Sequence, residues 1–313
     1  MTRILFYLDE PGYEIWKEAF IDAIPGVDVR NYPHWGEPED GPAYAFVWNP
    51  KPGIIADQPN ITHVFSFGAG VDHILRDPTI PEELPVIRMS DDGLKDGMAE
   101  FVLMSVLMHH RGMHKLMAAQ LQKQWIDTFY PTEAADVRVG MLGYGALARA
   151  AISRLLPIGY KINAWSRTPK ATENNVTHYA GREDLADFLN ATDILVCLLP
   201  ATSETNNLLD ADTLSLLPKG AAIINAGRGN LIDIDALVVQ LDSDHLSGAT
   251  LDVFPTEPLP QGSLLWHHPK ITITPHIAAI TRPKNATRYV AHCIAQIERG
   301  KQPDNLLDRS SGY

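Results

Sequence analysis

Short apolar runs alternate with segments of helical periodicity along almost the whole chain. Many of these runs are rich in β-branched or aromatic residues, as buried strands are. Strands that alternate with helices form parallel sheets, because a parallel pair needs a crossover connection that is usually a helix. The sequence therefore predicts an α/β protein. The predicted strands are residues 4–8, 27–32, 43–48, 63–68, 137–142, 162–166, 193–199, 221–226, 248–254 and 271–276.

The predicted strands fall into two groups, which indicates two domains. The first group occupies roughly ninety residues, a length typical of a small domain, and the second begins at residue 137. A last helical pattern, over residues 282–299, follows the final strand without opening another strand–helix unit. That helix is free to return to the first domain. The predicted domains are residues 1–98 with 281–313, and residues 99–280.

Two helical patterns bear on how the domains are built. Pro11 suits the first turn of a helix after the first strand. A longer pattern runs over residues 97–125, and its segment 101–108 is nearly all apolar. That segment is too short to span a bilayer. A helix that is apolar around most of its girth is predicted to be buried between domains or between subunits.

Charge and cysteine content exclude several classes of protein. The chain has 26 Lys plus Arg and 38 Asp plus Glu, a net charge of −12, which disfavours nucleic-acid phosphate as a partner. The apolar run at the N-terminus is too short for a signal peptide or membrane anchor. Cys197 and Cys293 each stand in an apolar stretch. Buried, reduced thiols in a soluble cytoplasmic protein are therefore expected.

A glycine-rich turn follows the strand predicted at residues 137–142. Gly143, Gly145 and Ala148 have the spacing G-x-G-x-x-A, and Ala146 and Leu147 begin the helical pattern behind them. The glycines permit a tight turn and close approach of a pyrophosphate, whose charge the N-terminus of the helix stabilises. The order strand, glycines, helix predicts a dinucleotide site. A methyltransferase that binds an adenosine half is the alternative.

The end of the next strand indicates which dinucleotide is bound. An NAD site places an acidic residue about twenty residues after the turn, on the ribose hydroxyls. Here Ser166, Arg167, Thr168 and Lys170 stand in that place, with no acid before Glu173. Arg167 is suited to pair with a 2′-phosphate, and the two hydroxyls are suited to donate to it. The segment predicts NADP(H), the alternative being an ordinary solvated loop.

Three polar residues stand at the ends of the last three predicted strands, where open α/β sheets place their ligands. They are Arg228, Glu257 and His276. Each alone has an ordinary explanation: a salt bridge, a surface turn, the end of a strand. Together they form a candidate catalytic set.

Several motifs in one order resemble a known enzyme family. They are "FGAGVDHI", the G-x-G-x-x-A turn, "LLPATSET", "LDVFPTEPL" and "ITPHIAAITRP". Over nearly its whole length the chain resembles the D-isomer-specific 2-hydroxyacid dehydrogenase family. It is most similar to the glyoxylate/hydroxypyruvate reductase A branch, which shares "WSRT", a "VW" shortly before proline and the ending "DRSSGY".

The resemblance implies a fold and an assembly. Family members have two Rossmann-like, doubly wound parallel-sheet domains, with the active site in the cleft between them. The first domain binds substrate and is closed by the C-terminal helix, and the second binds the dinucleotide. The resemblance also implies a homodimer, with residues 99–130 as the dimerisation segment.

The resemblance also implies a reaction, namely NADPH-dependent reduction of glyoxylate and hydroxypyruvate to glycolate and glycerate. Reducing a 2-keto acid requires a hydride on the carbonyl carbon, a proton on its oxygen and a clamp for the carboxylate. Histidine is the side chain that ordinarily exchanges a proton near neutral pH, so His276 is suited to give the proton. Glu257 is suited to orient its imidazole. Arg228 is suited to hold the carboxylate and polarise the ketone. These are the roles that the family gives to the matching residues.

The remaining expected contacts follow the same resemblance. Backbone N–H groups at Gly68, Ala69 and Gly70 are expected to bind the substrate carboxylate, and Trp48 to wall the substrate, unless it is a core residue. Asp252 is expected beside the nicotinamide amide, unless it caps a turn. The further expected cofactor contacts are Leu199, Pro200, Thr205 and Ala226.

Other functions are weighed against this one. His110 and His114 have helical spacing, but no third ligand stands near them, so no metal site is predicted. Formate dehydrogenases pair the histidine with Gln where Glu257 stands, and phosphoglycerate dehydrogenases need an acid where Arg167 stands. A dinucleotide-binding corepressor, or a family enzyme with a bulkier substrate, stays open as an alternative.

Overall fold

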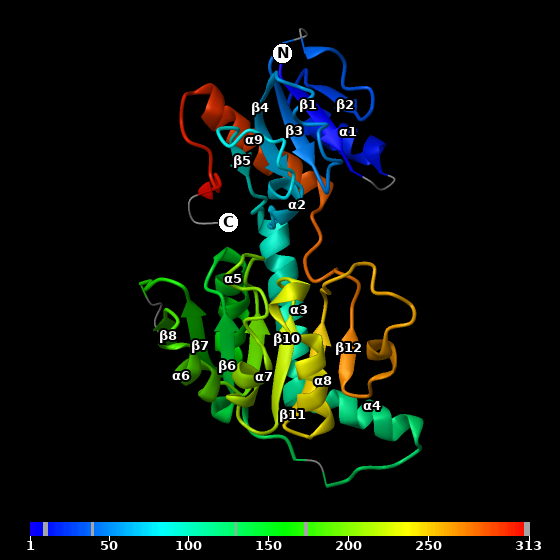
Figure 1. Cartoon of the computed structure of the whole chain (residues 1–313), viewed down its shortest axis with the longest axis vertical. Coiled ribbons are helices and arrows are strands. Elements are labelled where there is room, and N and C mark those ends of the chain that lie inside the picture. The colour runs from blue at the N-terminus through cyan, green and yellow to red at the C-terminus, as the bar shows by residue number, and fades with distance from the viewer. Residues whose placement is uncertain (9–11, 39–40, 129, 172–174, 310–313) are drawn as a thin grey trace. The chain divides into compact units, whose positions relative to one another are not determined.

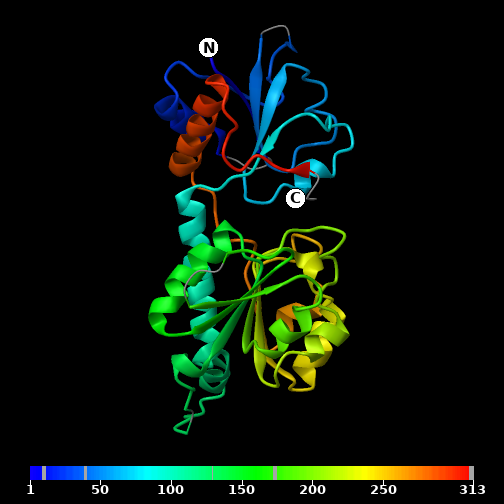
Figure 2. The same cartoon turned by 90° about the vertical axis from the view of Figure 1, so that its left-hand side faces the viewer.

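The computed structural model describes residues 1–8, 12–38, 41–128, 130–171 and 175–309, and Pro11 lies outside them. The chain divides into two compact units. Unit 1 is Met1–Leu94 with Ile280–Tyr313, and unit 2 is Lys95–Ala279. One boundary between the units falls inside a helix, and the other falls in the loop that follows a strand. Figures 1 and 2 show the elements of each unit.

Unit 1 is built on a five-stranded sheet of order β2-β1-β3-β4-β5, and all of its pairs are parallel. Helices α1 and α9 contact each other although they come from opposite ends of the chain (Figure 1). In α9 the buried residues Ala286, Val290, Cys293 and Ile294 recur at helical spacing and form one apolar face. The strands are β1 (Arg3–Tyr7), β2 (Asp28–Asn31), β3 (Ala43–Val47), β4 (Ile61–Ser66) and β5 (Val86–Ile87), and the helices are α1 (Tyr13–Ala23), α2 (Asp72–Leu75) and α9 (Pro283–Glu298).

Unit 2 contains a seven-stranded parallel sheet of order β12-β11-β10-β9-β6-β7-β8. The chain leaves β6 in one direction and returns to its other side at β9, so the strand order reverses there. Ligands bind outside the carboxyl ends of the strands at such a reversal. The strands are β6 (Arg138–Leu142), β7 (Lys161–Ser166), β8 (Val176–Ala180), β9 (Ile194–Cys197), β10 (Ala221–Asn225), β11 (Leu246–Leu251) and β12 (Ile271–Ile273).

Helices of unit 2 connect these strands and cover the sheet. The central strands β9 and β10 are buried along their whole length, which explains their continuous apolar sequences. The predicted α/β class with two parallel sheets is confirmed. The helices are α3 (Asp92–His110, whose first turn belongs to unit 1), α4 (Met113–Leu121), α5 (Ala146–Leu155), α6 (Leu185–Asn190), α7 (Ala211–Ser215) and α8 (Ile234–Asp242).

The prediction of one long helix over residues 97–125 is wrong in its extent. The segment forms two helices, α3 and α4, separated by Gly112, whose φ of 59° is left-handed. Glycine adopts that conformation without steric cost, and it ends the first helix. Trp125 follows α4 and is exposed rather than helical. Among the described helices, none is both long enough and apolar enough to cross a bilayer.

Two strands have no counterpart among the predicted ones. β5 has only two residues, and β8 is an edge strand whose sequence, "VTHYA", is half polar. The predicted last strand is also shorter than expected, because β12 ends at Ile273. His276 therefore lies in the loop after the strand and does not end it.

Candidate active site

The loop that carries His276 is held by a buried carboxylate. Asp252, at the end of β11, is 1% exposed and lies inside the loop that follows β12. Its Oδ1 accepts from Thr274 Oγ1 (2.5 Å) and from the N–H of Ile277 (2.9 Å), and its Oδ2 accepts from the N–H of Ala278 (2.9 Å). The N–H of His276 donates to the backbone oxygen of Asp252 at 2.8 Å. These bonds hold His276 in a left-handed conformation, with φ of 54°.

Glu257 and His276 form a hydrogen-bonded pair. Glu257 Oε2 lies 2.7 Å from His276 Nδ1, and Glu257 Oε1 accepts from the N–H of Phe254 at 2.9 Å. Burial raises the pKa of Glu257, but the hydrogen bonds from His276 and Phe254 and the positive charge of Arg228 outweigh burial, so its pKa lies below the usual value. Glu257 is therefore a carboxylate at neutral pH, and it can orient the imidazole.

Arg228 stands on a turn that the end of β10 fixes. Asn225 is 1% exposed; its Oδ1 accepts from the N–H of Gly227 (3.1 Å), and its Nδ2 donates to the backbone oxygen of Arg228 (3.0 Å). The next residue, Gly229, packs on the backbone of the neighbouring loop. A Cβ at Gly229 would lie 1.9 Å from the carbonyl carbon of Phe254. The Arg228 and Glu257 loops are therefore in backbone contact, and only glycine fits between them.

The three predicted catalytic residues thus come from the carboxyl ends of neighbouring strands. Arg228 follows β10, Glu257 follows β11, and His276 follows β12. The pair Glu257–His276 is directly bonded, and the positive charge of Arg228 lies close enough to lower the pKa of Glu257. A proton donor, a carboxylate that orients it and a cation for an anionic ligand are brought together. This is the chemistry needed to reduce a keto acid.

The turn after β6 has the geometry of a phosphate-binding loop. Gly143 has a φ of 114°, and Gly145 precedes α5, which no described side chain caps. A Cβ at Gly145 would meet nothing within 4 Å, so the space above the turn is open. Ala146 and Leu147 begin the helix, and Ala148 is 1% exposed, where a small residue lets the helix pack on the strands. The residues present therefore fit a dinucleotide's pyrophosphate at the positive end of α5.

The segment after β7 combines a buried hydroxyl with exposed cations. Ser166 is 5% exposed, and its hydroxyl donates to the backbone oxygen of Thr168 at 2.8 Å. The Nε2 of His178 lies 2.8 Å from the same hydroxyl and therefore donates to it. Burial and the charge of Lys170 lower the pKa of His178. The hydroxyl of Ser166 thus shapes the loop, and its expected contact with the cofactor stays a prediction.

Arg167 is the exposed cation at the tip of this segment. Its Nη1 lies 3.5 Å from Glu204 Oε2, and the two side chains are 41% and 67% exposed. An ion pair this exposed contributes less than about 1 kcal/mol, so it is easily exchanged for a stronger partner. A phosphate would be such a partner.

The loop after β9 holds three further predicted residues. The hydroxyl of Thr205 donates to the backbone oxygen of Pro200 at 2.7 Å, which closes a turn directly after Leu199. Ala226 is 8% exposed and follows β10. All four lie at the same edge of the sheet as the Gly143 turn, because they follow neighbouring strands. The hydrogen bond from Thr205 to Pro200 fixes the shape of the loop after β9.

Unit 1 holds the other predicted substrate residues at the ends of β3 and β4. Trp48 follows β3 and packs against His73, with ring centroids 4.4 Å apart and ring planes tilted by 54°. Gly68, Ala69 and Gly70 form a bend after β4 and are partly buried. A Cβ at Gly68 would lie 2.9 Å from the Trp48 ring, so the bend packs against that ring.

Sequence reasoning missed the residues that position these groups. Asn225 and Ser66 are buried polar residues at the ends of strands, and both bond to the backbone of the following loop. A polar residue that ends an otherwise apolar strand is the signal that would have indicated them. His73, in the helix α2, is a third buried polar residue that bonds to the backbone of a loop, and the sequence identifies it only as part of a motif.

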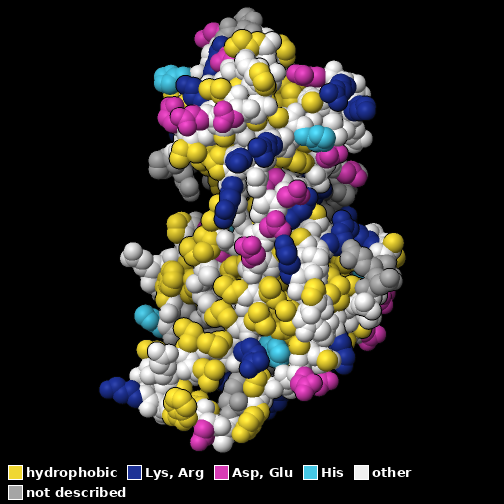
Figure 3. All heavy atoms as spheres, turned by 180° about the vertical axis from the view of Figure 1, so that it is seen from behind, with side chains coloured by type: hydrophobic (Ala, Val, Ile, Leu, Met, Phe, Trp, Pro, Cys, Tyr) yellow, Lys and Arg dark blue, Asp and Glu magenta, His cyan; other side chains and the backbone are white. Residues whose placement is uncertain are grey.

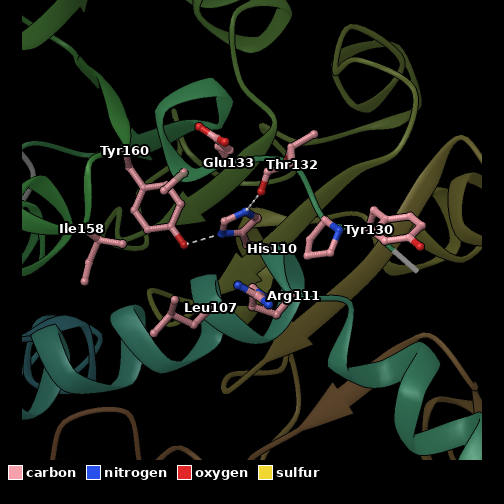
Figure 4. A pocket seen from close by; sticks show the side chains of 10 residues that line it. Leu107, His110, Arg111, Tyr130, Thr132, Glu133, Ile158 and Tyr160 are labelled. Atoms are coloured by element: carbon pink, nitrogen blue, oxygen red, sulfur yellow. Dashed lines mark hydrogen bonds between the residues drawn. The ribbon is translucent and has the colours of Figure 1, made fainter. Parts of the chain in front are cut away.

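A pocket of about 440 Å³ lies away from all of these residues (Figure 4). It is lined from α3, from residues 130–134 before β6, and from Tyr160 before β7, so it lies at the amino ends of these strands. His110 donates from Nε2 to the backbone oxygen of Thr132 (2.7 Å) and accepts at Nδ1 from Tyr160 (2.8 Å). His114 contacts His109 instead, and no three His, Cys, Asp or Glu side chains in the described ranges are grouped for a metal ion.

Comparison with known proteins gives the family. Residues 103–278 match the profile of the D-isomer specific 2-hydroxyacid dehydrogenase, NAD binding domain. The chain is 37% identical over 317 residues to a glyoxylate/hydroxypyruvate reductase A of Serratia proteamaculans, covering 99% of this chain and 100% of that protein.

Two solved structures show the same fold over the whole chain. A D-isomer specific 2-hydroxyacid dehydrogenase from Xanthobacter autotrophicus, in complex with NADPH and MES, is 40% identical with a TM-score of 0.95, covering 100% of this chain and 99% of that one. An NADPH-dependent glyoxylate/hydroxypyruvate reductase from Sinorhizobium meliloti, in complex with NADP and sulfate, is 34% identical with a TM-score of 0.91, covering 100% of both chains. The chain belongs to the D-isomer specific 2-hydroxyacid dehydrogenase family.

Proposed function

We propose that the protein is an NADPH-dependent reductase of small 2-keto acids, with glyoxylate and hydroxypyruvate as its substrates. The observation that carries the proposal is the Glu257–His276 pair beside Arg228, at the edge of the sheet where the phosphate-binding turn also opens. The named relatives support the choice of substrates and of NADPH.

The bound NADPH supplies a hydride to the carbonyl carbon of the substrate. The protein supplies the proton and the electrostatic environment. Because Glu257 holds Nδ1 of His276, the proton leaves from Nε2 to the ketone oxygen. Glu257 stays ionised and stabilises the positive imidazole before the proton is transferred. The same pair takes the proton back when a 2-hydroxy acid is oxidised.

Arg228 supplies a planar, paired donor for the substrate carboxylate and polarises the ketone oxygen. From unit 1, the backbone N–H groups at Gly68, Ala69 and Gly70 add further donors for that carboxylate, and Trp48 limits the size of the substrate. The close packing of the Gly68 bend on the Trp48 ring supports assigning both to one substrate site.

The preference for NADPH is assigned to the segment after β7. Arg167 exchanges Glu204 for the 2′-phosphate, and Lys170 adds a second positive charge. Thr168 offers a hydroxyl to the phosphate, while Ser166 holds the loop through its hydrogen bond to the backbone oxygen of Thr168. Around the nicotinamide end, Leu199, Pro200, Thr205 and Ala226 form the wall, and Asp252 lies behind it.

The test of the function is NADPH oxidation, followed by absorbance, with glyoxylate, hydroxypyruvate, pyruvate and phenylpyruvate. Turnover of the two small substrates is expected to be highest. His276→Ala is expected to lower kcat by about 10²–10⁴-fold, the usual worth of a general acid, while NADPH still binds. The exposed His267 gives the matched control, and His267→Ala is expected to behave as the wild type.

Absence of turnover with every keto acid would contradict the enzymatic proposal. It would favour a protein that binds the dinucleotide and acts through other proteins. Turnover of phenylpyruvate alone would instead indicate a family enzyme with a bulkier substrate.

Cofactor choice is tested at Arg167. Arg167→Asp places a negative charge beside the 2′-phosphate and is expected to raise KM for NADPH by at least about tenfold, since a charge-assisted hydrogen bond is lost. KM for NADH is expected to change less than about threefold. Equal losses for both cofactors would mean that the 2′-phosphate is recognised elsewhere. Arg182→Asp, at another exposed arginine of unit 2, is the control for added negative charge.

We also propose a cytoplasmic homodimer formed through α3, α4 and the residues that follow. Figure 3 shows hydrophobic side chains gathered on the face of unit 2 where α3 lies. The two buried, unpaired cysteines fit a reducing compartment. The exposed apolar residues of the segment are Met104, Met113, Met117, Leu121, Trp125, Ile126 and Tyr130.

A further inference from the structure

A buried histidine in unit 1 lies between the two segments to which substrate contacts are assigned. His73 is in α2 and is 4% exposed. Its Nδ1 accepts from the N–H of Asn49, the residue after Trp48, at 3.1 Å. A backbone N–H is always a donor, so Nδ1 carries no proton. The ring is therefore neutral in this arrangement, with its hydrogen on Nε2.

The second ring nitrogen continues the chain of hydrogen bonds toward the glycine bend. His73 Nε2 lies 3.2 Å from Ser66 Oγ and donates to it. Ser66, fully buried at the end of β4, donates its own hydrogen to the backbone oxygen of Gly70 at 2.7 Å. Ser66 Oγ also accepts from the N–H of Gly68 at 3.3 Å. One direction of donation thus runs from Asn49 through His73 and Ser66 to Gly70.

The imidazole also makes the packing contact between the two segments. The Trp48 ring packs against His73 at a tilt of 54°, with a centroid distance of 4.4 Å, and its edge lies against Gly68. Asn49 has a left-handed φ of 47°, a conformation that a hydrogen bond to its N–H helps to hold. The position of Trp48 and the shape of the bend at Gly68–Gly70 therefore both depend on the His73 ring.

We propose that His73 is a positioning residue for substrate recognition: through Asn49 on one side and Ser66 on the other, it fixes Trp48 and the Gly68–Gly70 bend at one spacing, and so sets the affinity for the keto acid. The inference rests on the proposed function, because it assumes that these two segments contact the substrate. It assigns no chemical step to His73. Its removal therefore weakens binding of the ground state and of the transition state alike.

The test compares three substitutions at His73. His73→Phe keeps the ring and removes both hydrogen bonds, and it is expected to raise KM for hydroxypyruvate about tenfold or more. Its kcat and its KM for NADPH are expected to stay within about twofold. His73→Asn places an acceptor near Nδ1, and His73→Gln places a donor near Nε2. Each is expected to recover part of the affinity that His73→Phe loses.

The control is His63→Phe, because His63 lies on the same strand as Ser66 and contacts only the ring of Tyr44 among the described rings. It is expected to leave both KM values unchanged. Ser66→Ala interrupts the same chain of hydrogen bonds without touching the histidine and is expected to raise KM for hydroxypyruvate in the same way. Ser66→Ala carries the test if His73→Phe does not fold.

The outcomes separate this inference from the function on which it rests. If the wild type reduces no keto acid, the proposed function fails and the inference fails with it. If the wild type is active and His73→Phe and Ser66→Ala keep its KM for hydroxypyruvate, only the inference is overturned. A loss of kcat with unchanged KM would also overturn it, since it would show a role in the chemical step.

Discussion

At the scale of single residues, Asp252 shows how a buried charge positions a reactive side chain. Its carboxylate oxygens accept from Thr274, Ile277 and Ala278, on both sides of His276. Burying a carboxylate costs free energy, and a protein buries one only where hydrogen-bond donors such as these surround it. We expected Asp252 beside the nicotinamide amide or in a turn cap. Its observed bonds are those of an anchor for the His276 loop.

Asp252→Asn tests that reading. The amide keeps one acceptor and replaces the other with a donor that faces the N–H groups of the loop. Stability is expected to fall by about 1.5–3 kcal/mol, the worth of a hydrogen bond to a charged group. As His276 is displaced, kcat is expected to fall about 10–100-fold, with KM for NADPH nearly unchanged. Steady-state kinetics and urea unfolding measure both. A rise in KM for NADPH with kcat intact would instead place Asp252 on the nicotinamide.

The residue scale also shows what a sequence can and cannot reveal. Arg228, Glu257 and His276 could be predicted as candidate site residues, because polar side chains that follow apolar strands point to a ligand edge and these three stand in family motifs. Asn225, Ser66 and His73 act by bonding to the backbone of loops. Such bonds depend on loop conformation, which a pattern of residue types does not encode.

At the scale of secondary-structure elements, the long central strands were predictable and the short ones were not. β9 and β10 are buried on both faces, so burial alone forces a continuous apolar run. β8, at the edge of its sheet, carries polar residues and has no such pattern. The break between α3 and α4 depends on one glycine adopting φ of 59° inside a pattern that otherwise continues. Nothing in the periodicity indicates that conformation.

The contact between the Arg228 and Glu257 loops depends on Gly229, and a substitution tests it. In Gly229→Ala the added methyl would lie 1.9 Å from the carbonyl carbon of Phe254, so one loop must move. Overpacking of this kind is expected to lower stability by about 1–3 kcal/mol. Moving either loop is also expected to lower kcat/KM about a hundredfold. Gly262→Ala, where a Cβ meets nothing within 4 Å, is the control. Wild-type kinetics in Gly229→Ala would contradict this account.

The bend between α3 and α4 places two histidines against β11. His109 Nε2 lies 2.9 Å from Thr250 Oγ1, and the ring centroids of His109 and His114 are 5.8 Å apart. His109 Nδ1 and His114 Nε2 are buried without a hydrogen-bond partner among the described residues. Burial, and then the neighbouring His114, lower the pKa of His109 from 6.5 to about 4. Burial and the charges of Lys115 and Lys270 lower that of His114.

Stability is therefore expected to depend on pH through His109. Its pKa is lower in the folded state, so between pH 6.5 and about 4 the unfolded chain binds the proton more tightly. The free energy of unfolding is fully retained above pH 6.5 and falls below it, by about 2 kcal/mol at pH 5. Urea unfolding at pH 7 and pH 5 measures the difference. His109→Gln is expected to reduce it and His267→Gln to leave it unchanged. An equal pH dependence in His109→Gln would rule out this assignment.

At the scale of the whole molecule, the net charge has the same sign as the proposed ligands. The chain has a net charge of −12, yet the proposed substrate and cofactor are anions. The structure resolves this locally. Arg167 and Lys170 lie together after β7, and Arg228 follows β10 beside the Glu257–His276 pair. Overall charge argued against nucleic acid, but it holds no information about individual ligand sites.

The proposed dimer gives a prediction at this scale. By size-exclusion chromatography with light scattering, the wild type is expected to have twice the chain mass of 34.6 kDa. Leu121 is 87% exposed and Met117 53% exposed, so Met117→Glu with Leu121→Glu is expected to give a folded monomer. Val239→Glu, at an exposed apolar residue of α8, is expected to stay dimeric. A monomeric wild type, or a double variant that remains dimeric, would exclude this surface as the interface.

The chain passes between the two units at two places, and these are not equivalent. One lies between Leu94 and Lys95 inside α3, and the other lies between Ala279 and Ile280, directly after the loop that carries His276. At the second place Asp252 bonds to Ile277 and Ala278, so its hydrogen bonds end one residue short of Ala279, the last residue of unit 2. Along this connection the hydrogen bonds to Asp252 lie between unit 1 and the imidazole of His276. A displacement of the chain at the crossing therefore acts on those hydrogen bonds first. The loop that carries His276 is thus tied to the end of β11 close to where the chain leaves unit 2.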